Sequence, residues 1–172
     1  MSKSVLRHLW DELAFTPGEI LRADLFLGIA GAGGAAALAV IAPDALLRGV
    51  SVAAGLVGVI IGSVIASVAV QTAFMDQSFL RKLRVIDREP VRYVAPFLFT
   101  ACISVFAMLG LIVLSTLSAK SNVALLGTVG SLTGFFTIWA IASLIYCLDT
   151  LVQFMGLKMD AVDVPDDVKL IA

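Results

Sequence analysis

The chain has 172 residues, of which 60% are hydrophobic and 15% are charged, and its mean hydropathy is +1.03. A soluble domain of this length cannot bury so much apolar surface, because ordinary globular chains are about 45–50% apolar and about 25% charged. The net charge of −1 offers no electrostatic footprint for nucleic acid, which we exclude as a partner. The composition therefore predicts an integral membrane protein whose first partner is lipid.

Four uncharged runs divide the chain, at residues 25–43, 49–75, 93–119 and 121–148. Each can cross a hydrocarbon core of about 30 Å as a helix that rises about 1.5 Å per residue. None alternates apolar and polar residues as the strands of a membrane barrel do. The runs predict an all-α membrane protein, a four-transmembrane-helix bundle with short outer loops and with spans at approximately 20–42, 46–75, 93–118 and 123–152.

The placement of basic residues predicts the orientation of the bundle. Ten lie before the first span, between the second and third, or after the fourth: Lys3, Arg7, Arg22, Arg81, Lys82, Arg84, Arg88, Arg92, Lys158 and Lys169. The two remaining connections hold one each, Arg48 and Lys120. Since basic loops stay in the cytoplasm, we expect both termini to be cytoplasmic, in the cell membrane or inner membrane.

Capping signals predict where the helices begin. Residues 16–19 form a capping box ahead of the first helix, and Pro43 with Asp44 can break the chain and cap the second. Ser121 with Asn122 can cap the fourth helix, and Pro96 is expected in the first turn of the third, where a proline costs little. The second and fourth helices exceed the membrane thickness, so we expect their excess to project into the cytoplasm.

Three domains follow: an amphipathic N-terminal helix at 1–16, the membrane bundle at 17–155, and an acidic cytoplasmic tail at 156–172. Trp10 is expected at headgroup level in the first, because apolar side chains there share one helical face. Together with the loop 76–92, the two ends would form a small cytoplasmic collar. The candidate contacts for a partner or for lipid are Trp10, Arg81, Lys82, Arg84, Asp149, Asp163, Asp166 and Asp167.

Small residues form a ladder on several spans, at four-residue spacing on the second. The candidate packing positions are Gly28, Gly31, Gly34, Ala54, Gly58, Gly62, Ala66, Gly130 and Gly134. Such faces let helix backbones approach closely where lipid provides no hydrophobic drive to associate. The pattern is typical both of packing within one bundle and of contact between protomers, and the sequence leaves these alternatives open.

Polar residues within the spans are the other candidates. Ser63, Ser67 and Gln71 share a face of the second span and could line a pore in an oligomer. Thr128, Ser131 and Thr137 mark the fourth. Alternatively, the hydroxyl groups bond back to carbonyls of their own helix. The absence of Asp, Glu, Lys, Arg and His at mid-membrane depth disfavours a pump or coupled transporter.

The sequence contains no HExxH, GxSxG or phosphate-binding glycine loop, and Cys102 and Cys147 lack CxxC spacing. We therefore expect no catalytic residue, no cofactor and no metal. The leading hypothesis is a non-enzymatic homo-oligomer whose cytoplasmic face anchors, senses for or scaffolds a soluble or membrane partner. The alternatives are a pore-forming channel, a membrane-disrupting effector of the holin-like or antiphage-defence type, and an accessory subunit of a larger membrane complex.

Overall fold

The computed structural model describes residues 23–75 and 91–162, which form helices and, within these ranges, no strand. The helices are α3 (Ala23–Ile41), α4 (Pro43–Phe74), α6 (Val91–Thr116) and α7 (Val123–Val162). Each is long and apolar enough to cross a membrane, so the predicted all-α fold with four spans is confirmed. The amphipathic N-terminal helix, the capping box and most of the basic loop and acidic tail lie outside the described residues.

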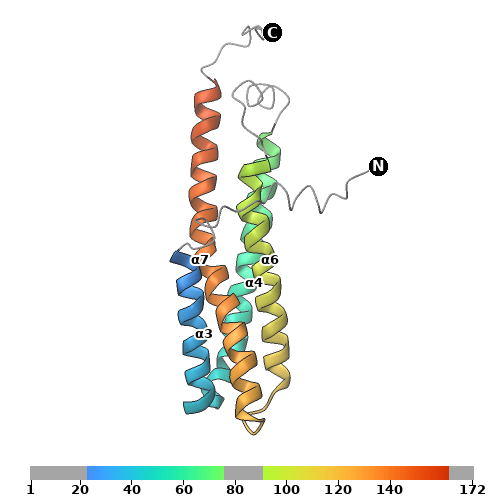
Figure 1. Ribbon diagram of the computed structural model, residues 1–172. Coiled ribbons are helices and arrows are strands. Elements are labelled where there is room, and N and C mark those ends of the chain that lie inside the picture. Colours follow the sequence, from blue (N-terminus) through green and yellow to red (C-terminus); the bar gives the residue numbers. More distant parts are fainter. Residues whose placement is uncertain (1–22, 76–90, 163–172) are drawn as a thin grey trace, which may run out of the picture.

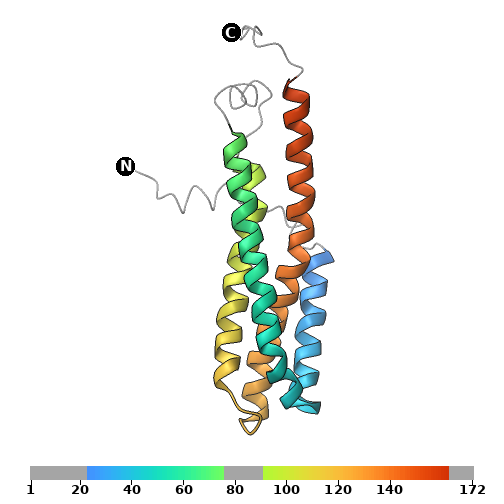
Figure 2. The same cartoon turned by 180° about the vertical axis from the view of Figure 1, so that it is seen from behind.

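The four helices run side by side along one axis (Figures 1 and 2). The connections from α3 to α4 and from α6 to α7 lie at the same end of the bundle, which we call the turn end. The longest helix, α7, extends beyond the first residues of α3 at the opposite end. It contacts all three other helices, with α3 and α6 as its main neighbours, whereas α4 packs chiefly on α6. The helix α7 is thus the centre of the bundle.

The helix ends at the turn end differ in part from the sequence-based expectation. Asn122 caps α7, since its Oδ1 accepts a hydrogen bond of 2.9 Å from the backbone N–H of Ala124, as predicted. The cap of α4 is Ala42, without a side-chain hydrogen bond, and Asp44 already lies in the first turn. The expectation that Asp44 caps this helix was wrong. Pro43 provides a helical φ at the first position, and Asp44 then places its charge near the positive end of the helix.

Pro96 lies inside α6 rather than in its first turn, because the helix begins at Val91, earlier than the span predicted. A proline lacks an N–H group and leaves a carbonyl of the preceding turn without its helical partner. Its own carbonyl accepts a 3.0 Å hydrogen bond from Thr100 Oγ1 and a 3.6 Å contact from Cys147 Sγ of α7. The proline position is thereby part of the polar contact between α6 and α7.

Buried positions recur every seven residues along the bundle. On α4 they are Val50, Val57, Val64 and Gln71. On α7 they are Leu126, Thr133, Ala140, Cys147 and Phe154. A seven-residue repeat keeps one seam facing its neighbours when helices cross at a shallow left-handed angle, as in coiled coils and many membrane bundles. Each of these two helices therefore has a continuous buried seam, and we call each seam position a layer of the core.

The outer surface is apolar along the whole bundle. Large hydrophobic side chains are well exposed on every described helix, among them Phe26, Val40, Val59, Ile65, Phe106, Ile112, Ile145 and Val152. A soluble protein does not expose contiguous apolar surface on this scale. Such a surface needs hydrocarbon around it, which agrees with the assignment of the four helices as membrane spans.

Candidate functional site

The small residues of α3 and α7 are used within the protomer. A Cβ added to Gly31 would lie 2.6 Å from Ile138 Cγ1 and 2.7 Å from the carbonyl oxygen of Gly134. One added to Gly134 would lie 2.7 Å from the Gly31 carbonyl oxygen and from the Cβ of Ala35. The two backbones are so close that neither position accepts a side chain. This crossing of α3 over α7 is a small-residue contact of the kind that the sequence predicted.

Two more of the predicted glycines lie along the same contact, and one further glycine was not predicted. A Cβ at Gly28 would come within 3.1 Å of the Phe135 ring. One at Gly130 would lie 3.8 Å from the carbonyl oxygen of Ala35 on α3 and 3.2 Å from Leu46 Cδ2 on α4. Gly110 of α6, which the sequence analysis did not single out, lies directly against Thr133 of α7. Glycines therefore fix the approach of both α3 and α6 to α7.

The small-residue ladder of α4 has a different environment. A Cβ at Gly58 or Gly62 would have no heavy atom within 4 Å, and both residues are exposed, as is Ala66. Only Ala54 is half-buried. Gly34 of α3 also faces open space. We call Ala54, Gly58, Gly62 and Ala66 the α4 face; three of its four members have no role in the packing of the protomer.

The hydroxyl groups of the predicted polar stripe bond mostly within their own helices. Ser63 donates to the carbonyl of Ile60 at 2.8 Å, Thr128 to that of Ala124 at 2.8 Å and Ser131 to that of Gly127 at 2.7 Å. Ser67 is half-buried. The alternative reading, in which hydroxyls satisfy their own helix, therefore describes Ser63, Thr128 and Ser131.

Gln71 lies inside the protomer. Its side chain is fully buried, at the seven-residue seam position that follows Val64, and both amide atoms lack a hydrogen-bonding partner among the described residues. The hydroxyls of Thr133 and Thr137 are likewise buried without a partner in this part of the chain. An unpaired buried amide is costly, so Gln71 is a weak layer in an otherwise apolar α4 seam.

A buried carboxylate joins α3 to α7, and the sequence analysis missed it. Asp24 is 7% exposed; its Oδ2 accepts a 3.3 Å hydrogen bond from Trp139 Nε1, and its Oδ1 accepts the Leu25 N–H at 3.0 Å. The indole belongs to an aromatic cluster, with ring centroids 5.1 Å from Phe135 and 5.5 Å from Phe99. Tryptophan suits this place, because its ring is apolar and its N–H needs a partner.

Asp24 lies near one end of the membrane span of α3. It lies 18 residues from Ile41, counted inclusively, or roughly 27 Å along α3, close to the boundary of a core of about 30 Å. Acidic side chains inside membranes are expensive, and the bundle gives this one two hydrogen-bond donors, the Trp139 indole and the backbone N–H of Leu25. Asp24 therefore acts as a structural anchor of α3 near one membrane surface.

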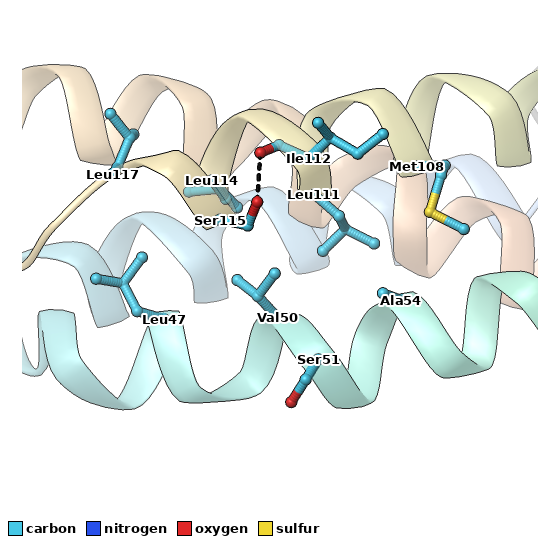
Figure 3. A pocket seen from close by; sticks show the side chains of 10 residues that line it. All are labelled: Leu47, Val50, Ser51, Ala54, Met108, Leu111, Ile112, Leu114, Ser115 and Leu117. Atoms are coloured by element: carbon cyan, nitrogen blue, oxygen red, sulfur yellow. Dashed lines mark hydrogen bonds between the residues drawn. The ribbon is translucent and has the colours of Figure 1, made fainter.

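A groove lies between α4 and α6 near the turn end (Figure 3). Its volume is about 380 Å³, and its walls are Leu47, Val50, Ser51, Ala54, Met108, Leu111, Ile112, Leu114, Ser115 and Leu117. The two serines are the only polar side chains among them, and both bond to their own helices: Ser115 to the Ile112 carbonyl at 2.7 Å and Ser51 to the Arg48 carbonyl at 3.4 Å. The groove thus offers no unused hydrogen-bond donor from a side chain.

Of the candidate contacts for a partner or for lipid, Asp149 lies within the described residues. Asp149 is exposed, and its Oδ2 accepts a 2.9 Å hydrogen bond from Gln153 Nε2 of the same helix. Trp10, Arg81, Lys82, Arg84 and the tail aspartates at 163, 166 and 167 lie outside the described residues. Over the ranges 23–75 and 91–162, no group of His, Cys, Asp and Glu side chains could hold a metal ion. Both cysteines there are free thiols, Cys102 exposed and Cys147 buried.

The fold and these contacts define a multi-spanning α-helical membrane protein with one glycine face used inside the protomer and another left open. Comparison of the chain with protein-family models, curated proteins and solved structures gives no match. A function must therefore be inferred from the faces of the bundle themselves.

Proposed function

We propose that this protein is a non-enzymatic membrane protein that assembles with copies of itself through the α4 face. The end of its bundle opposite the turn end would bind a partner. The observation that carries the proposal is the contrast between two sets of glycines. The space beside Gly31 is occupied by the backbone of Gly134, and the reverse also holds. No other helix occupies the space beside Gly58 or Gly62 within the protomer.

A bare small-residue face on a membrane helix is suited to a second helix. Lipid tails are as apolar as the side chains, so helices associate through close van der Waals packing, and glycine permits that approach. The large exposed side chains Val59 and Ile65, which are 69% and 64% exposed, lie beside Gly58 and Gly62 along the helix. They can act as ridges that pack into the small-residue groove of a partner helix.

The end opposite the turns is the proposed partner-binding side. Ten of the twelve Lys and Arg residues belong to the segments that leave or enter the bundle there, and the turn end has only Arg48 and Lys120. By the positive-inside rule that side is cytoplasmic. The helix α7 also continues past the beginning of α3 (Figure 2). Its exposed Asp149, which accepts a hydrogen bond from Gln153, is the contact that we propose for a cytoplasmic or membrane partner.

A pore lined by Ser63, Ser67 and Gln71 has less support. The Ser63 hydroxyl is occupied by the Ile60 carbonyl, and the Gln71 amide is fully buried inside the protomer rather than on an outer face. A pore at an oligomer axis needs polar groups that water or ions can contact. Self-assembly through the α4 face does not require them.

The test replaces Gly58 and Gly62 together with leucine and measures particle mass by native mass spectrometry after mild detergent extraction. Two leucines add bulk to a face that is open in the protomer, so we expect the protomer to stay folded while the oligomer dissociates to single chains. The matched control replaces Gly33 of α3 and Gly127 of α7 with leucine, because a Cβ at either position also meets nothing within 4 Å. An oligomer mass unchanged by the α4 pair, or lost with the control pair, would refute the proposed interface.

A further inference from the structure

The groove between α4 and α6 requires an apolar occupant. Eight of its ten wall residues are apolar, and the hydroxyls of Ser51 and Ser115 are already bound to their own helix carbonyls. A volume of about 380 Å³ is within the range of about 300–1,000 Å³ typical of sites for small ligands. Water gains few hydrogen bonds in such a space, so hydrocarbon is the favoured filling.

The groove lies within one membrane leaflet. Its α4 wall extends from Leu47 to Ala54, which are four and eleven residues beyond Pro43, or roughly 6 and 16 Å along the helix. Its α6 wall reaches Met108, eight residues before Thr116, or roughly 12 Å. Half of the hydrocarbon core is about 15 Å thick. An acyl chain of the leaflet at the turn end therefore has the depth that the groove requires.

Two cations lie close in sequence to wall residues of the groove at the turn end. Arg48 follows Leu47 on α4, and Lys120 follows Leu117 by three residues in the connection to α7; both cations are exposed. The acidic residue at this end is Asp44, so Arg48, Lys120 and Asp44 together give the turn end a net charge of +1. Arg and Lys side chains extend toward the headgroup layer when their backbone lies deeper in the membrane. They can hold a phosphate above an acyl chain seated below.

We infer that this groove is a binding site for an anionic phospholipid of the leaflet at the turn end. One acyl chain would lie between α4 and α6, against Val50, Leu111 and Leu114 (Figure 3). The phosphate would be bound by Arg48 and Lys120, the exposed cations that the chain carries at this end. The lipid fills the gap left where the two helices diverge. The inference uses only the span assignment and does not depend on the proposed self-assembly.

The test exposes the purified protein to mixed micelles with equal amounts of phosphatidylglycerol and phosphatidylcholine and counts retained lipid by native mass spectrometry. We expect one phosphatidylglycerol per chain. Ser115→Phe fills the groove from α6 and should lower retention about tenfold or more. Thr116→Phe is the control, because Thr116 is also exposed and bonded to its own helix but does not line the groove.

A second variant tests the headgroup contact separately. Arg48→Ala with Lys120→Ala should lower the preference for phosphatidylglycerol over phosphatidylcholine to about one while a lipid is still retained, since each cation attracts an anionic headgroup. Equal retention in Ser115→Phe and the wild type would overturn the site. An unchanged preference in the double variant would overturn the headgroup assignment. If Ser115→Phe instead separates oligomers without loss of lipid, a second copy covers the groove and the inference fails.

Discussion

Replacing Gly31 with leucine is expected to lower the stability of the folded bundle by about 3 kcal/mol, and Gly134→Leu by a similar amount. The Cβ atom alone would lie 2.7 Å from a backbone oxygen of the facing helix in either case. A backbone cannot yield as a flexible side chain does, so α3 and α7 must move apart. Their separation also strains the hydrogen bond between Asp24 and Trp139. Thermal unfolding in detergent, followed by circular dichroism, measures the loss.

Gly33→Leu is the matched control for the α3–α7 crossing. It lies two residues from Gly31 on the same helix, and a Cβ there has no heavy atom within 4 Å. We expect its unfolding temperature to stay within the scatter of the wild type. If Gly31→Leu and Gly134→Leu also unfold at the wild-type temperature, the crossing of α3 and α7 is looser than the structure shows.

Replacing Gln71 with leucine is expected to stabilise the protein, by about 1–2 kcal/mol. The amide is fully buried at a seam position, and no hydrogen bond from residues 23–75 or 91–162 compensates its desolvation cost. Leucine has a similar volume and matches the other α4 seam residues, Val50, Val57 and Val64. The measurement is the midpoint of thermal or denaturant unfolding in the same detergent.

Gln153→Leu provides the comparison, because the same chemical change is made at an exposed position. The Gln153 amide donates to Asp149, and its loss should change stability by only a few tenths of a kcal/mol. If Gln71→Leu destabilises the protein, the amide has a hydrogen-bonding partner that the described residues do not include. The buried position would then be a polar contact that specifies one helix register rather than a weak layer.

The presence of four membrane-spanning helices followed from the sequence, because uncharged runs of about 20 residues or more have few other structures available in lipid. Asn122 was predictable as a cap from its place before an apolar run. Pro96 was misplaced because Arg92 ended the predicted span, while the helix begins at Val91, before the apolar span that starts at Val94. Charge marks where a membrane begins, and helices continue past that boundary.

The roles of the glycines could be predicted only in part. Gly31 and Gly58 both belong to small-residue ladders, and no local sequence feature indicates that Gly31 faces α7 while Gly58 faces away from the other helices of the protomer. A seven-residue repeat in the sequence does indicate which positions of α4 face the core. Positions 50, 57, 64 and 71 form one line on α4, which identifies Gln71 as a core residue and leaves Gly58 and Gly62 off the seam.

Two features required the three-dimensional arrangement. Asp24 and Trp139 are 115 residues apart, and the acid was passed over because it ends a charged segment rather than interrupts an apolar one. The groove depends on the divergence of α4 from α6 near the turn end, which is a property of packing between helices and not of either sequence segment. Both features would be visible in a sequence only through pairs of positions that vary together.

The α4 face is tested most directly by cross-linking in native membranes. A cysteine at position 62, in a chain with Cys102→Ala and the buried Cys147 retained, should form a disulfide-linked dimer on mild oxidation, because a disulfide requires two Cα atoms within about 7 Å. A cysteine at position 33 on the open side of α3 is the control and should give little dimer. Strong cross-linking at 62 alone is the predicted result. No dimer at 62, or equal dimer at 62 and 33, would contradict self-assembly through the α4 face.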